Sequence, residues 1–93
     1  MNVFVGSGMF YGARFANDGK ILKFILIDER EGKANNEIPC LIFNPDEEMK
    51  GLFAKERVIE FQGKVQNFSY EVAGEKVSRT EVIVNTRSIR VIR

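Results

Sequence analysis

The arrangement of strand-like stretches constrains the fold of this chain most strongly. Five stretches rich in β-branched and aromatic residues cover residues 2–15, 20–30, 37–43, 57–70 and 76–92, and the one helical segment follows the third. Such residues favour strands. The chain has 93 residues, long enough for one compact core but too short for two. We therefore expect one mostly β domain over residues 1–93, with a helix between its third and fourth strands.

Turn signals between these stretches predict how the strands connect. Glycines at positions 6, 8 and 12 permit the bulges of a strongly curved first strand. Asn17-Asp18-Gly19 and Ala73-Gly74-Glu75 predict tight turns, and Pro39 predicts an edge or irregular position. A three-stranded meander, a helix and a closing hairpin make the five-stranded Greek-key barrel called the OB fold. An SH3-like barrel or a small β-sandwich stays open, although neither normally places a helix there.

Segment 44–48 carries the signals of a helix start. Asn44 provides a capping side chain, Pro45 suits the first helical position, and the acidic residues at 46–48 favour the positive end of the helix dipole. The pattern predicts that the helix ends near residue 55 or 56. Three apolar residues at helical spacing should form its buried face: Met49, Leu52 and Phe53.

Composition argues against catalysis. Histidine is absent and Cys40, a buried thiol by its apolar neighbours, is the only cysteine, which removes most general-base, zinc and disulfide chemistry. Asp28, Glu29 and Glu31 form the densest acidic cluster outside the helix, but Arg30 interrupts it and the spacing of calcium ligands is missing. We expect a solvated loop there, and no enzyme, metal site or cofactor.

The apolar stretches at 24–27 and 40–43 are far shorter than the roughly 18 residues that cross a bilayer. Met1 leads into a strand pattern rather than a signal peptide, so we expect a cytoplasmic protein without membrane contact. The net charge of +1 means that any attraction to nucleic acid must come from local clusters of Lys and Arg.

The fourth stretch has a face suited to nucleic acid. Period-2 spacing places Lys64, Gln66, Phe68 and Tyr70 on one face, opposite an apolar face of Ile59, Phe61, Gly63 and Val65. A sequence-tolerant binder of single strands needs a cationic groove and exposed rings on which bases stack. Phe68 and Tyr70 could equally pack across the closing hairpin, and the pattern leaves both readings open.

Phe43 closes the third strand, where a core position and a stacking position are both open. Phosphate contacts are expected from four cations that the sequence scatters along the chain: Arg14, Lys23, Arg57 and Arg79.

Three groups of segments resemble bacterial single-stranded DNA-binding proteins (SSB). They are Asn2-Val3 with residues 19–26, the Ile38-Pro39-Cys40-Leu41-Ile42-Phe43 segment, and residues 60–70 with 79–84. The resemblance covers nearly the whole chain. It implies an OB-fold domain that binds single-stranded DNA, or RNA, in replication, repair and recombination, in the cytoplasm with the nucleoid, or in an organellar stroma if plastid-derived.

The resemblance also bears on individual residues. Phe43 and Tyr70 occupy positions where the family places base-stacking aromatics, whereas Phe68 has no firm counterpart. Two further aromatics of the family are replaced here by Glu37 and by the charged segment around Arg30, which implies weaker affinity. The sequence stops at residue 93 without the family's glycine-rich linker and acidic tip, so tail-dependent partners are not expected. A tailless replication accessory similar to primosomal replication protein N, or a protein-interaction module with little DNA affinity, is the alternative.

The second stretch predicts assembly. It is apolar on both faces, and a small barrel buries only its interior face. We therefore expect Ile25 and Ile27 at or near a contact between subunits. The resemblance implies a homodimer or a homotetramer. The alternating residues are Leu22, Phe24 and Leu26 on one face and Ile21, Ile25 and Ile27 on the other.

Overall fold

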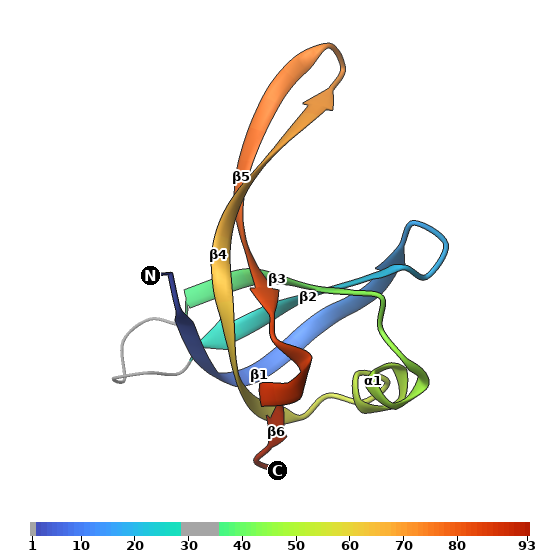
Figure 1. Cartoon of the computed structure of the whole chain (residues 1–93), viewed down its shortest axis with the longest axis vertical. Coiled ribbons are helices and arrows are strands. Elements are labelled where there is room, and N and C mark those ends of the chain that lie inside the picture. The colour runs from blue at the N-terminus through green and yellow to red at the C-terminus, as the bar shows by residue number, and fades with distance from the viewer. Residues whose placement is uncertain (1, 29–35) are drawn as a thin grey trace.

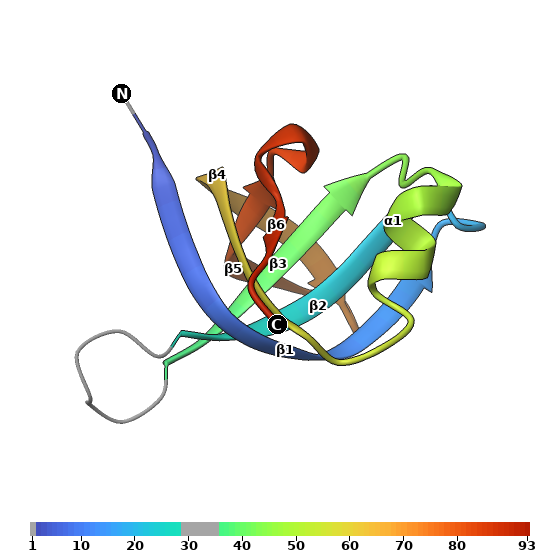
Figure 2. The ribbon, with the colours of Figure 1, turned by 90° about the horizontal axis from the view of Figure 1, so that it is seen from below.

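The computed structural model describes residues 2–28 and 36–93. These residues form the strands β1 (Phe4–Ala16), β2 (Ile21–Asp28), β3 (Asn36–Phe43), β4 (Val58–Val72), β5 (Glu75–Val84) and β6 (Arg90–Val91), the helix α1 (Glu47–Leu52) and the 3₁₀ turn η2 (Thr86–Ser88). The strand order is β1-β2-β3-β5-β4-β6, and a further pairing of β1 with β4 closes the ring. The pairing of β3 with β5 is parallel and the others are antiparallel. Figure 2 shows the ring, which confirms the predicted OB fold.

The short strand β6 was not predicted as a separate element. The stretch predicted over residues 76–92 is interrupted by η2, and β6 follows it and pairs with the start of β4 through Ile59 and Glu60. Among the described residues, no helix is long and apolar enough to span a membrane.

The core lies inside this ring. Leu22, Phe24 and Leu26 alternate inward from β2 and are all but fully buried, as predicted. Phe24 is central, because its ring centroid lies 5.8 Å from that of Phe10, 4.7 Å from that of Phe53 and 6.0 Å from that of Phe61. Rings from β1, β2, β4 and the end of α1 thus meet at one point, which ties the helix to the barrel.

Strand β1 is bent around the barrel, as its glycines predict. Gly8 pairs with Asp28 of β2 on one side and with Ile59 of β4 on the other. A Cβ atom on Gly8 would overlap the carbonyl oxygen of Ile27. The pairing with β2 also shifts register between Tyr11 and Arg14, as in a β-bulge. Glycine at position 8 therefore allows β1 to pair with both β2 and β4, which closes the ring.

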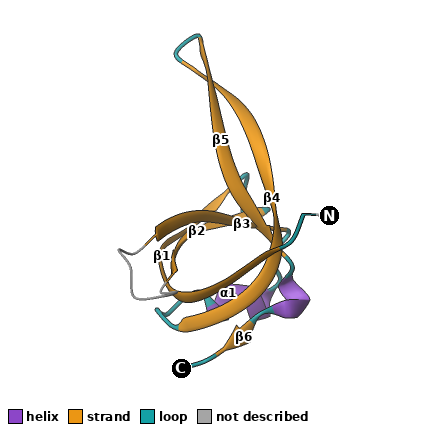
Figure 3. Ribbon diagram, turned by 90° about the vertical axis from the view of Figure 1, so that its left-hand side faces the viewer, coloured by secondary structure: helices purple, strands orange, loops and turns teal. Residues whose placement is uncertain are grey.

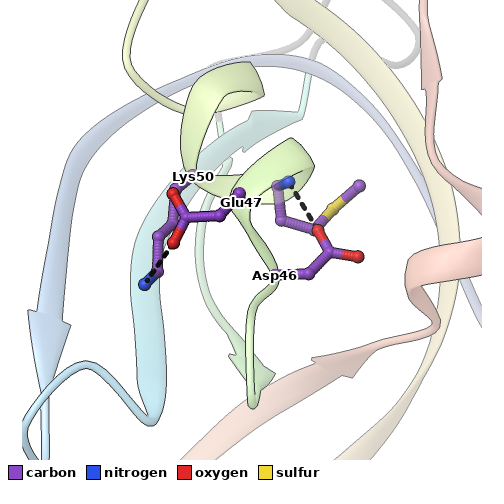
Figure 4. A network of polar contacts seen from close by, with 4 residues as sticks. Asp46, Glu47 and Lys50 are labelled. Atoms are coloured by element: carbon purple, nitrogen blue, oxygen red, sulfur yellow. Dashed lines mark hydrogen bonds and ion pairs between the residues drawn. The ribbon is translucent and has the colours of Figure 1, made fainter.

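The helix begins later and ends earlier than predicted. Its N-cap is Asp46, not Asn44, because the Asp46 carboxylate accepts a 2.8 Å hydrogen bond from the Met49 amide (Figure 4). Asn44 has a φ of 51° and its amide donates to the carbonyl oxygen of Lys20, so it ends β3 instead. The helix ends at Leu52 rather than at 55 or 56, because the next residue, Phe53, turns its ring into the core. Met49 and Leu52 pack against that core as expected.

The β4–β5 hairpin extends beyond the barrel as an arm (Figures 1 and 3). Its pairs run from Gly63 with Val84 to Val72 with Glu75, and the predicted turn follows, with Ala73 and Gly74 at positive φ. Val65 was expected to continue the buried face of β4, but it is 37% exposed. Residues 64–67 of β4 are all exposed, because no other described segment of the chain covers the arm there.

Candidate nucleic-acid interface

Three aromatic residues and one lysine that the sequence singled out lie around one hollow on the outside of the barrel. They are Phe43 of β3, Phe68 and Tyr70 of β4, and Lys23 of β2. The hollow measures about 290 Å³, and we call it the apolar hollow. The other residues that line it are Ala16, Asn17, Ile21 and Leu41.

Strand register explains why these side chains meet. Lys23 of β2 pairs with Arg14 of β1 and with Leu41 of β3, and Leu41 in turn pairs with Ile83 of β5, which pairs with Lys64 of β4. Residues directly opposite each other point to the same face of a sheet. One outward row thus crosses five strands, with the cations Arg14 and Lys23 at one end, Lys64 at the other, and the apolar Leu41 and Ile83 between them.

Phe43 is a surface residue. Its neighbour Ile42 is fully buried in the core, whereas Phe43 pairs with Ile21 on the outer face and is 46% exposed. The choice that the sequence left open between core and surface is therefore decided for the surface. The Phe43 ring is available to a ligand in the apolar hollow.

Phe68 and Tyr70 contact each other. Their ring centroids are 6.2 Å apart and the planes differ by 26°, so the rings stack along β4. Their cross-strand partners are not aromatic, since Phe68 lies opposite Arg79 and Tyr70 opposite Val77. The two rings therefore pack mainly on each other, and Tyr70 also contacts β5 across the hairpin through its hydroxyl and Glu81.

Tyr70 is held by polar contacts as well. Its hydroxyl donates a 2.5 Å hydrogen bond to Oε1 of Glu81, a residue that is 5% exposed. This bond raises the pKa of the Tyr70 hydroxyl above its ordinary value. The Lys23 ammonium lies 5.5 Å from the Tyr70 ring centroid, within the range of a cation–π interaction.

A second hollow adjoins the first and shares Lys23 and Tyr70 with it. It measures about 270 Å³, and we call it the charged hollow. Its other lining residues are Glu71, Val72, Val77, Arg79 and Glu81. Arg79 and Tyr70, both predicted to contact nucleic acid, therefore line the same hollow. The two hollows adjoin and form a continuous strip that reaches the arm.

The remaining predicted cations are less central. Arg14 and Lys64 lie at the two ends of the outward row, and Lys64 lines a separate hollow with Gln62 and Ile83. Gln66 is exposed on the same face of β4 but lines neither hollow. Arg57 is not brought to this surface, because it precedes β4 and its Nε donates to the carbonyl oxygen of Leu52 at the end of α1.

Two residues of this surface were missed from the sequence. Leu41 was not singled out, but it is an almost fully buried residue that lines the apolar hollow. Glu81 was not singled out, although period-2 spacing from Arg79 places it on the same face of β5. That spacing was the available signal, and it would have identified the partner of Tyr70.

Other sequence expectations concern sites away from this surface. Cys40 is buried, and burial raises the pKa of its thiol to about 12, so it stays protonated near neutral pH. Residues Glu29, Arg30 and Glu31 of the acidic cluster lie outside the described residues. Within residues 2–28 and 36–93, no three His, Cys, Asp or Glu side chains are close enough to hold a metal ion.

Neither a scan against protein-family models nor a search of curated proteins found a match. Solved structures do match over nearly the whole chain. One is the mitochondrial single-stranded DNA-binding protein Rim1 of S. cerevisiae, with a TM-score of 0.71 at 13% sequence identity. The match covers 99% of this chain and 95% of the Rim1 chain. The Plasmodium falciparum SSB in complex with ssDNA has a TM-score of 0.65 at 18% identity, covering 99% and 93%.

A third match is the dimeric structure of the N-terminal domain of PriB from Thermoanaerobacter tencongensis. Its TM-score is 0.67 at 18% identity, and the match covers 99% of this chain and 97% of that one. The chain thus has the OB fold of single-stranded DNA-binding proteins, and the aromatic residues of its outer surface lie on β3 and β4.

Proposed function

We propose that this protein binds single-stranded DNA, with little regard to sequence, along the strip formed by the two hollows. Phe43, Phe68 and Tyr70 provide faces for base stacking, and Lys23 and Arg79 contact phosphates. Arg14 and Lys64 extend the phosphate path at either end of the outward row. The protein acts by binding and not by catalysis, in replication, repair or recombination.

The observation that carries this proposal is the convergence of three aromatic side chains, from β3 and β4, on one hollow beside a lysine of β2. Single-strand binding requires rings beside cations, because stacking holds the bases while the cations hold the backbone. The apolar hollow places Phe43, Phe68 and Tyr70 around Lys23. The similar structures, described as single-stranded DNA-binding proteins, support the same reading.

A titration with oligo-dT, oligo-U and duplex DNA at about 50 and 200 mM salt tests this function. We expect tighter binding to single strands than to duplex, because only unpaired bases offer their faces to the rings. Higher salt should weaken the binding, because phosphate contacts release counterions. Equal or tighter binding to duplex DNA would contradict the proposal, and the ratio of oligo-dT to oligo-U affinity gives the preference between DNA and RNA.

A protein-interaction role with little DNA affinity is the second candidate. The observation that favours it is the outer face of β2, where Ile25 and Ile27 are only partly buried. Opposite Ile25 lie Tyr11 of β1 and Pro39 of β3, which extend the apolar area across three strands. The hydroxyl of Tyr11, which is 40% exposed, donates to Glu37 at the end of this area.

We propose that a second copy of this chain covers the outer face around Ile25 and Ile27. Light scattering should give the mass of a homodimer or homotetramer, and a mass near the 10.6 kDa of one chain would contradict the proposal. Ile25→Glu should dissociate the assembly, because the contact would bury an unpaired charge. Val91→Glu makes the same kind of change at an exposed position of β6 and should leave the mass unchanged.

A further inference from the structure

A buried carboxylate lies at the hydroxyl end of Tyr70, one of the three rings on which the proposed function depends. Glu81 is 5% exposed, and its Oε1 accepts the 2.5 Å hydrogen bond of Tyr70. A buried carboxylate is stable only when donors satisfy it. The contact therefore stabilises Glu81 and at the same time fixes the far end of the Tyr70 ring.

The same ring is also restrained from its side. Phe68 stacks on it with centroids 6.2 Å apart, and both rings belong to one strand. A tyrosine side chain has two rotatable torsions, so a fixed hydroxyl and a neighbouring ring leave it little freedom. A base that stacks on Tyr70 then loses less conformational entropy on binding, because the ring is already ordered.

For phosphates, the same carboxylate is unfavourable. Glu81 lines the charged hollow together with Lys23 and Arg79, and its negative charge opposes their attraction for a polyanion. If phosphate binding alone determined affinity, removal of the Glu81 charge could only strengthen binding.

We infer that Glu81 is a positioning residue for base stacking, which acts through the Tyr70 hydroxyl and increases affinity for bases at some cost in affinity for phosphates. The inference rests on the proposed function, since it needs a strand in the hollows. It predicts opposite effects on two ligands: a strand that carries bases and a strand that does not.

Two substitutions separate the hydrogen bond from the charge. Glu81→Gln and Glu81→Leu remove the same charge and keep a similar size, but only glutamine retains an acceptor for the Tyr70 hydroxyl. We expect the leucine variant to bind oligo-dT about fivefold more weakly than the glutamine variant, the equivalent of one neutral hydrogen bond of about 1 kcal/mol. The glutamine variant should bind oligo-dT at least as tightly as the unmodified protein.

An abasic oligonucleotide of the same length is the control ligand, because it offers phosphates and no bases. Both variants should bind it equally, and each at least as tightly as the unmodified protein. Thermal melting of every variant shows that the domain is folded. A difference confined to oligo-dT is the signature of positioning, since partial unfolding would weaken binding to both ligands.

Tyr70→Phe removes the donor of the same hydrogen bond instead of its acceptor. It tests the inference if the Glu81→Leu variant does not fold. It keeps the ring but removes the donor, so oligo-dT binding should weaken by about the same factor, with abasic binding unchanged. Equal oligo-dT binding by the folded leucine and glutamine variants, or unchanged binding by Tyr70→Phe, would overturn the inference. Failure of the unmodified protein to bind oligo-dT would be a different result, because it would overturn the proposed function itself.

Discussion

Replacing Phe24 by alanine is expected to lower the free energy of unfolding by about 3–5 kcal/mol. The Phe24 side chain is 1% exposed and contacts the rings of Phe10, Phe53 and Phe61. Its removal leaves a cavity where the barrel strands and the end of α1 meet. Because those partners come from three other elements, the walls of this cavity cannot all move inward.

Urea unfolding of the two proteins gives this difference directly. Phe15→Ala is the matched control, since it removes the same ring from a position that is 51% exposed, and it should cost about 1 kcal/mol or less. A loss at Phe24 as small as that at Phe15 would mean that the barrel interior is not packed around this ring.

The second large effect concerns binding. Phe43→Ala and Tyr70→Ala should each weaken oligo-dT binding by about 1–3 kcal/mol, or about 5- to 150-fold in Kd, because each removes one face for base stacking. The melting temperature of Phe43→Ala should fall little, since the ring is 46% exposed. Fluorescence anisotropy of a labelled oligo-dT measures the binding, and calorimetry measures the melting.

Phe15→Ala again provides the control for these two variants, because Phe15 is at least as exposed as either ring but lies outside both hollows. It should bind oligo-dT as the unmodified protein does. Equal losses in all three variants would point to a general effect of exposed rings. A sharp drop in the melting temperature of Phe43→Ala would mean that the Phe43 ring packs in the core and is not a surface residue.

The sequence was sufficient to predict the succession of the five long strands and the helix along the chain, because alternation, turns and glycines are local signals that agree with one another. In β2, the alternation of Leu22, Phe24 and Leu26 correctly predicted the interior face. The cap of α1 was placed two residues too early, since Asn44 and Asp46 are both good capping residues. Two contacts of the folded chain decide between them: the Met49 amide donates to the Asp46 carboxylate, and the Asn44 amide donates to the carbonyl oxygen of Lys20, just before β2.

The candidate site was predictable in its parts but not in its arrangement. Period-2 spacing placed Phe68 and Tyr70 on one face, whereas their approach to Phe43 and Lys23 depends on the register of β2, β3 and β5. The parallel pairing of β3 with β5 joins residues 42 positions apart, such as Cys40 and Val82, and no local pattern predicts it. The burial of Glu81 beneath Tyr70 follows from that same pairing.

We propose above that single-stranded DNA lies along the two hollows. An NMR titration of the isotope-labelled protein with oligo-dT of about 15 nucleotides tests this placement directly. We expect the largest changes in amide chemical shift in the residues that line the two hollows, at positions 21–23, 41–43, 68–70 and 79–81. Changes centred instead on the opposite side of β4, around Val5, Glu60 and Arg90, or no changes at all, would contradict it.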